Sequence, residues 1–129
     1  MRVFAMVILG EPASLKNSRR LVTTGRGRHA RRRVIKSEKA MGYMDSARWQ
    51  ATQAMGGRAM LKGRLGISGL LYYRTERPDL DGEAICDALQ GIVYANDRQL
   101  RAKVWDHRID KANPRAEIVI FELEDEDDA

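Results

Sequence analysis

Residues 65–89 read LGISGLLYYRTERPDLDGEAICDAL, and they contain both kinds of secondary structure in a short space. Leu65 to Tyr73 alternates between two sets of side chains and ends in two aromatic residues, which predicts a strand. In Asp79 to Leu89, apolar residues such as Leu80 and Ala84 recur at helical spacing. That spacing predicts a helix whose apolar face packs on a sheet.

The flanking sequence predicts four further elements. A buried strand is expected at Arg2–Leu9, and a helix ended by two glycines at Lys39–Met55. Two more alternating segments, Lys103–Ile109 and Ala116–Leu123, are separated by a turn at Asn113-Pro114, which suggests an antiparallel hairpin. The first helix carries one apolar stripe, expected to comprise Met41, Met44, Ala47 (or Arg48), Ala51 and Met55.

These elements fit one small domain. A chain of 129 residues has the usual length of a single domain. We expect the α+β class, with a small mixed sheet and two helices on one face, over residues 1–121. Residues 122–129 hold six acids and are expected to form a disordered acidic tail, or else to compete with nucleic acid for basic residues.

Composition also bears on location. The first apolar run has strand length and lacks a cleavage pattern after it, so we expect neither export nor a membrane partner. The single cysteine, Cys86, can form no internal disulfide, which favours a reducing compartment. The expected location is the cytoplasm.

Positive charge is concentrated near the N-terminus. The net charge is +5 with a pI near 9.7, but residues 11–39 contain ten Lys or Arg against two acids. Residues 11–38 lack sustained periodicity and are predicted to be a long basic loop that binds phosphates. The residues expected to contact DNA are Lys16, Asn17, Arg19, Arg20, Arg31, Arg32, Arg33 and Lys36.

Acidic residues gather around the second helix. Asp79, Glu83 and Asp87 are spaced by four, so they would line one stripe of a helix. If residues 79–81 are extended instead, Asp79 and Asp81 face the same side. The segment that follows the helix could bring Asp97 back beside the start of that helix. Such hard oxygen ligands suit Mg²⁺, which activates water in phosphodiester cleavage. Alternatively, the acids form a solvated helix face.

The sequence offers few residues for other kinds of catalytic site. His29 and His107 are the only histidines, and they do not form a metal-binding pair. We expect His107 on a strand surface and His29 in the basic loop. The sequence contains neither a glycine-rich phosphate loop nor a nucleophile elbow.

At these residues the sequence resembles the RusA-type Holliday junction resolvases, small endonucleases common in phages and prophages. The family pattern has Asp-x-Asp-Asn, a lysine a few residues on, Asp-Ala-Leu, a Gly with apolar residues, and then Asp-Asp or Asn-Asp before a polar residue and Gln. The matching segments here are Asp79-Leu80-Asp81, Asp87-Ala88-Leu89 with the following Gln90-Gly91-Ile92-Val93-Tyr94, and Asn96-Asp97-Arg98-Gln99. In the N-terminal half, Gly10-Glu11-Pro12, Lys16-Asn17-Ser18-Arg19 and a helix containing Tyr43 also look similar.

The sequence departs from this pattern in two ways. Gly82 replaces the family asparagine, and the spacing from Asp81 to Asp87 is about two residues shorter than in the pattern, so alignment on the first Asp pair needs a deletion. The lysine is absent in either alignment. Aligned without a gap on the Asp-Ala-Leu segment, Glu83 occupies the lysine position. The resemblance implies metal ligation by Asp79 and Asp97, while Asp81 and Glu83 compete for the remaining ligand position.

The resemblance therefore implies a Mg²⁺-dependent endodeoxyribonuclease, with Mn²⁺ as a second candidate metal. Its substrate would be the four-way junction of recombination and repair, in a bacterial host. Paired cuts in a two-fold substrate also imply a homodimer. Two alternatives stay open: a non-catalytic basic nucleic-acid-binding protein, and a degenerate resolvase that binds junctions but cuts them slowly.

Overall fold

The computed structural model describes residues 2–13, 19–24, 31–36, 38–76 and 82–124, and for 19–24 and 31–36 it describes the backbone. These residues form a single α+β domain, as predicted. The elements in chain order are β1 (Val3–Leu9), β2 (Arg19–Thr24), β3 (Arg31–Lys36), α1 (Glu38–Met55), β4 (Leu65–Tyr73), α2 (Glu83–Leu89), a 3₁₀ turn η2 (Asp97–Gln99), β5 (Leu100–Ile109) and β6 (Arg115–Glu122).

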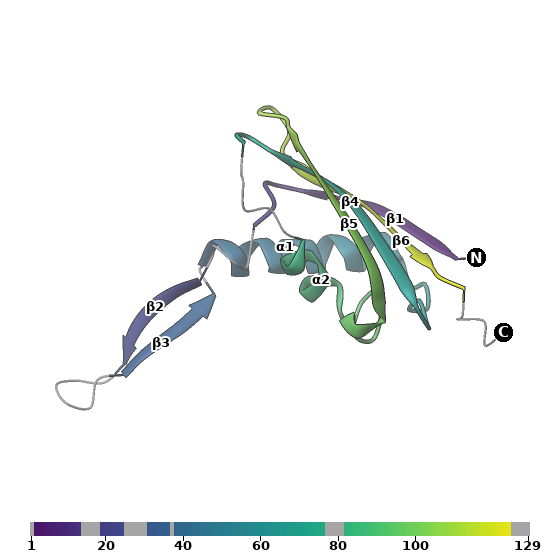
Figure 1. The fold of residues 1–129 in the computed structure, drawn as a ribbon, viewed down its shortest axis with the longest axis horizontal. Helices are drawn as coiled ribbons and strands as arrows, with labels where there is room; N and C mark the ends of the chain where they lie inside the picture. The colour runs from purple at the N-terminus through teal and green to yellow at the C-terminus, as the bar shows by residue number, and fades with distance from the viewer. Residues whose placement is uncertain (1, 14–18, 25–30, 37, 77–81, 125–129) are drawn as a thin grey trace.

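The main sheet is mixed and has four strands. Their order is β1-β6-β4-β5, in which β4 and β5 run parallel and the other neighbours run antiparallel. Figure 1 shows both helices on the same face of this sheet. The predicted mixed sheet with two helices on one face is therefore confirmed.

The predicted hairpin between Lys103–Ile109 and Ala116–Leu123 is wrong. Both segments are strands, but β6 pairs with β1 and β4, and β4 separates it from β5. The reason is burial: Ala116, Ile118 and Ile120 are at most 1% exposed in the centre of the sheet. Most positions of β5 are exposed, which suits an edge strand.

The helices bury small side chains against the sheet. In α1 the buried residues are Ala40, Tyr43, Ala47, Ala51 and Met55, and in α2 they are Ala84, Ile85, Cys86, Ala88 and Leu89. The predicted stripe of α1 is therefore partly wrong, because Met41 is 52% exposed. Ala40 and Tyr43 take its place, which rotates the buried stripe and allows the helix to approach the sheet closely.

The segment predicted to be a long basic loop contains a second sheet, so that prediction is wrong in its secondary structure. Strands β2 and β3 pair antiparallel, from Arg19 opposite Lys36 to Thr24 opposite Arg31. Figure 1 shows this hairpin projecting from the N-terminal end of α1, away from the four-stranded sheet. Its arginine-rich strands lack the apolar alternation by which a strand is usually recognised.

The start of α2 depends on a contact between Gly82 and Trp105. Gly82 is the N-cap residue of α2, so the helix starts at Glu83 and is shorter than predicted. A Cβ atom at Gly82 would lie 2.1 Å from Cζ2 of the Trp105 indole, and one at Gly69 of β4 would lie 2.6 Å from its Cε3. Two glycines therefore make room for one tryptophan, which holds the start of α2 against β5.

We predict that Gly82→Ala destabilises the fold by about 1–3 kcal/mol, because the added methyl group overpacks against the indole. The backbone is not the cause, since Gly82 has a negative φ of −102° that alanine tolerates. Thermal and denaturant unfolding of Gly82→Ala, Trp105→Leu and the double variant would measure the effect.

In the Trp105→Leu background, Gly82→Ala should lose most of its cost. An undiminished cost there would contradict the steric explanation. Gly42→Ala is a matched control, because a Cβ at Gly42 in α1 meets nothing within 4 Å. That variant should be neutral or stabilise the helix by up to about 1 kcal/mol.

Candidate active site

The candidate acids divide into those that the structure describes and those that it does not. Glu83 and Asp87 lie one turn apart on α2, and Asp97 begins η2. Asp79 and Asp81 fall outside the described residues, as do Lys16 and Asn17 of the predicted DNA-contacting set. The remaining members of that set lie in β2 and β3: Arg19, Arg20, Arg31, Arg32, Arg33 and Lys36.

A capped turn places Asp97. The Asn96 side chain accepts a hydrogen bond from the backbone N of Arg98 (2.9 Å), and Gln99 Oε1 accepts one from the backbone N of Asn96 (3.0 Å). This reciprocal pair is a capping box. Gln90, which ends α2, accepts a hydrogen bond from the backbone N of Asp97 at 2.9 Å. The Asn-Asp-Arg-Gln motif therefore joins Asp97 to the C-terminal end of α2.

Lys103 connects β5 to the start of α2. Its Nζ lies 3.1 Å from Oε1 and 3.4 Å from Oε2 of Glu83. Burial lowers the pKa of Lys103, but the hydrogen bond to Glu83 and the charges of Glu83 and Asp97 outweigh it, so the pKa is raised. The site therefore contains a firmly protonated ammonium among carboxylates.

Lys103 was not among the site residues predicted from the sequence. The available signal was its position in β5: Lys103 alternates with Trp105 and His107, and both of these pack toward the helix side of the sheet. Alternation places all three on one face of the strand. A lysine on the face that meets a helix needs a partner, and here that partner is Glu83.

Cys86 is not suited to be a nucleophile. Burial raises the pKa of its thiol to about 12, the nearby Lys103 charge lowers it, and the charges of Glu83, Asp97 and Asp87 raise it. The thiol is therefore protonated at neutral pH. Tyr94 donates a hydrogen bond from its hydroxyl to the Cys86 carbonyl oxygen at 2.6 Å, and burial raises the pKa of that hydroxyl. Both residues belong to the support of α2.

His107 lies on β5, as expected, but it is half-buried rather than on the surface. Its ring meets Tyr73 edge-on, with 5.5 Å between ring centroids. His107 Nε2 and the Tyr43 hydroxyl are buried, and neither has a hydrogen-bond partner among the residues that the structure describes. His29 lies outside the described residues.

The described acids do not by themselves make a metal site. Within residues 82–124 and the other described ranges, no group of three or more His, Cys, Asp or Glu could hold a metal ion. The donors that are present, the carboxylates of Glu83 and Asp97, have the hard oxygen atoms that Mg²⁺ prefers. The residues therefore fit a magnesium ion chemically, and Asp79 and Asp81 would have to complete the set.

Three further findings bear on the identity of the chain. Among the described helices, none is long and apolar enough to span a membrane. No curated protein matches the sequence. A protein-family model, Endodeoxyribonuclease RusA, matches residues 12–121, which include both helices, the capped turn and all the candidate acids. The chain therefore belongs to the RusA family of endodeoxyribonucleases, the enzymes that resolve Holliday junctions.

Proposed function

We propose that this nuclease cuts four-way DNA junctions with Mg²⁺, in recombination and repair. It would act in the cytoplasm of a bacterial host and be encoded by a phage or prophage. The observation that carries the proposal is the contact of Lys103 with Glu83, beside the charge of Asp97. Lys103 is thus a cation among acids, and its partner Glu83 follows the segment that contains Asp79 and Asp81. Such an arrangement favours binding and cleavage of a phosphodiester.

The Lys103 contact bears on the open choice between Asp81 and Glu83. Both oxygens of Glu83 lie within 3.4 Å of the Lys103 ammonium, so its charge is already largely balanced. We therefore assign metal binding to Asp79, Asp81 and Asp97, and we assign to Glu83 the orientation of Lys103. Magnesium bound there would activate water and neutralise charge on the phosphate.

Lys103 would then contact the phosphate itself. The family lysine is missing near Glu83 in the sequence, but an ammonium from β5 reaches the same helix end. It is 31% exposed, so a non-bridging phosphate oxygen can approach it. A positive charge at that point stabilises the negative charge that develops during cleavage. This contact argues against the slow, degenerate resolvase.

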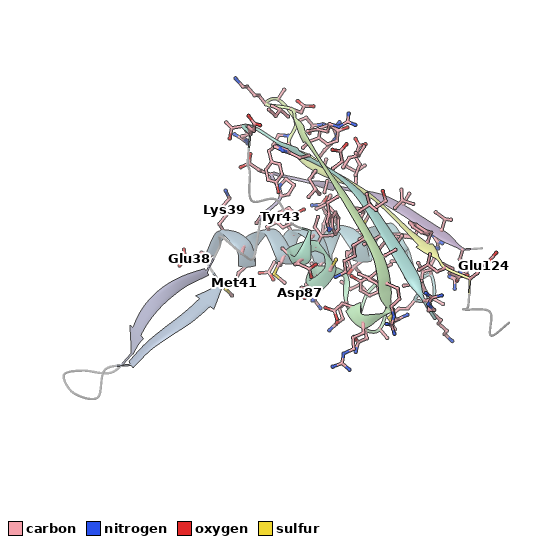
Figure 2. The ribbon with its side chains drawn as sticks, viewed as in Figure 1. Glu38, Lys39, Met41, Tyr43, Asp87 and Glu124 are labelled. Atoms are coloured by element: carbon pink, nitrogen blue, oxygen red, sulfur yellow. The ribbon has the colours of Figure 1, made fainter. Side chains whose placement is uncertain are left out.

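The β2–β3 hairpin is proposed as the DNA-binding arm. Arg or Lys occupies two of the six positions in β2 and four of the six in β3. A two-stranded ribbon has the right width for a DNA major groove, and basic residues on it neutralise phosphates. Figure 2 shows that the arm begins beside Glu38 and Lys39, at the end of α1 remote from Glu124. The arm could therefore reach DNA beyond the active site.

We expect Asp79→Asn and Asp97→Asn each to lower junction cleavage by roughly 100-fold or more, since each removes a metal-binding charge. Junction binding should be unchanged or tighter, because repulsion of phosphate falls. Cleavage of a labelled four-way junction with Mg²⁺ and with chelator, together with a binding assay, measures both effects. Asp45→Asn, an exposed position of α1, is the matched control. Wild-type cutting by either site variant would overturn the metal assignment.

The assignments of Asp81 and Glu83 make opposite predictions. Asp81→Asn should abolish cleavage, whereas Glu83→Gln should reduce it only as much as Lys103→Ala does. The double variant Glu83→Gln with Lys103→Ala should be little worse than either single variant, because the two residues act as one unit. Lys103→Arg should recover part of the rate. If the two losses multiply, Glu83 acts independently of Lys103 and the assignment is wrong.

The arm predicts a salt dependence. Replacing Arg31, Arg32 and Arg33 with alanine should weaken junction binding and flatten the slope of log K against log salt by about 0.9 per lost phosphate contact. The triple variant Arg48→Ala, Lys62→Ala, Lys111→Ala removes the same charge from exposed positions elsewhere and should change the slope less. Equal slopes for the two triple variants would show that net charge, and not the arm, causes the effect.

A further inference from the structure

The end of the four-stranded sheet at which β1 and β4 both stop lies between two segments that the proposed function needs. After β1 the chain continues toward the β2–β3 arm, and after β4 it continues into the segment that contains Asp79 and Asp81. A residue that contacts the chain at both places would therefore hold the proposed DNA-binding arm in a fixed relation to the proposed metal site.

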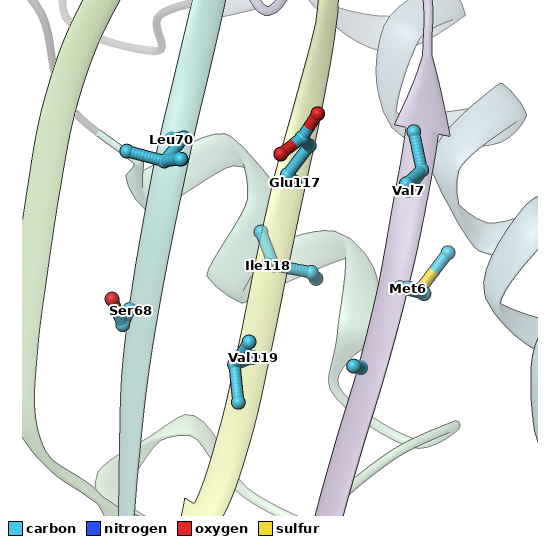
Figure 3. Close-up of a pocket in the computed structure, with 8 residues that line it drawn as sticks. Met6, Val7, Ser68, Leu70, Glu117, Ile118 and Val119 are labelled. Atoms are coloured by element: carbon cyan, nitrogen blue, oxygen red, sulfur yellow. The ribbon is translucent and has the colours of Figure 1, made fainter.

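The strand registers bring the ends of β1 and β4 to the same level. Figure 3 shows β6 between β1 and β4, with Val7 of β1 beside Glu117 of β6. Two residues further along, Leu9 of β1 and Tyr72 of β4 both pair with Arg115, the first residue of β6. The chain therefore leaves β1 and β4 on either side of a single strand, and a side chain can reach from one to the other.

Three hydrogen bonds fix the chain where it leaves β1. Gln50 of α1 accepts one from the backbone N of Leu9 at 2.8 Å and donates one to the carbonyl oxygen of Leu9 at 3.2 Å. The backbone N of Gly10 donates the third to the carbonyl oxygen of Pro114 at 3.1 Å. Gly10 has a φ of +106°, which glycine adopts without strain and which turns the chain here. Glu11 follows directly, so its backbone starts from a fixed point.

Glu11 makes the contact between the two places. Its Oε2 accepts a hydrogen bond from the backbone N of Arg74 at 2.8 Å, and its Oε1 lies 3.7 Å from Nζ of Lys39. Arg74 is the first residue after β4, so a carboxylate continues the bonding where the strand ends. Lys39 lies in the first turn of α1, three residues after the end of β3. One side chain therefore contacts both the start of the segment that contains the aspartates and the base of the arm.

The two contacts of Glu11 differ in strength. The Glu11 side chain is 20% exposed, but that of Lys39 is 59% exposed, so solvent screens the attraction between their charges and the ion pair contributes little. The hydrogen bond from Arg74 is short, and its acceptor is a carboxylate, which makes it one of the stronger kinds of hydrogen bond. The effect of Glu11 on its surroundings therefore depends mainly on the Arg74 contact.

We propose that Glu11 is a positioning residue for cleavage. By holding the backbone of Arg74, it fixes the start of the segment that contains Asp79 and Asp81 relative to the arm. The inference rests on the proposed function, in which those aspartates bind Mg²⁺ and the arm binds DNA. Glu11 itself touches neither metal nor DNA, so its loss should weaken metal binding through misplaced aspartates and leave junction affinity unchanged.

Three substitutions separate the hydrogen bond from the charge. Glu11→Gln keeps an oxygen acceptor at the same reach, Glu11→Asp keeps the charge but is one methylene shorter, and Glu11→Ala removes both. The Mg²⁺ concentration for half-maximal junction cleavage should rise roughly 10-fold in Glu11→Ala and Glu11→Asp, and should stay within about 3-fold of the wild type in Glu11→Gln. Lys39→Ala, the control for the ion pair, should leave the Mg²⁺ requirement unchanged. Junction affinity, measured with chelator, should be equal in all variants.

Hydrogen exchange of the metal-free protein gives a second measurement that does not depend on activity. The Arg74 amide should exchange at least roughly 10-fold faster in Glu11→Ala and Glu11→Asp than in the wild type or Glu11→Gln, because its acceptor is lost. The amide of Leu71, inside β4, is the internal control and should not change. If Glu11→Ala fails to fold, the comparison of Glu11→Gln with Glu11→Asp decides alone.

The outcomes separate this inference from the proposed function. An impaired Glu11→Gln with a normal Glu11→Asp would show that charge matters and would overturn the positioning role. The same holds if Lys39→Ala raises the Mg²⁺ requirement as much as Glu11→Ala does. Cleavage at an unchanged Mg²⁺ requirement in both Glu11→Ala and Glu11→Asp would refute this inference alone. A wild type that cuts no junction with Mg²⁺ would refute the proposed function.

Discussion

The position of β6 between β1 and β4 is the constraint on which the rest of the structure depends. Its alternate residues Ile118 and Ile120 are buried almost completely, and this apolar contact joins the N-terminal strand to the middle of the chain. Because β6 takes the central place, β5 can pair only with the free side of β4, parallel to it and at the edge. That edge position brings Lys103 and Trp105 to α2.

The candidate site lies where the edge strand β5 meets the short helix α2. Trp105 fills the space over Gly82, and Lys103 binds Glu83 one residue later, so packing and charge hold the same end of α2. At the other end, the capped turn attaches Asp97 to Gln90. Glu83 and Asp97 are thus held by separate packing and hydrogen-bond contacts, and such fixed placement would suit the metal and phosphate binding that we propose.

The two faces of the sheet differ in burial and in charge. One face buries the helices and carries the site residues of β5 at its edge. The other exposes Val7 and Val119 beside arginines that are paired with acids. Arg and Lys are concentrated instead in the β2–β3 arm, for which we propose DNA binding.

The sequence by itself determined most local elements of the four-stranded sheet and its helices, and the family of the enzyme. The spacing of apolar residues predicted the bounds of β4 and α1 to within one residue. The spaced acids and the Asn96–Gln99 motif indicated a RusA-type nuclease, and the family match confirms this. Only the tertiary structure decided that β5 and β6 do not pair and that Lys103 meets Glu83, 20 residues away in the chain. The periodicity of a sequence shows which face of a strand is buried. Which strands become neighbours, and which charges pair, depends instead on contacts between segments that are far apart in the chain.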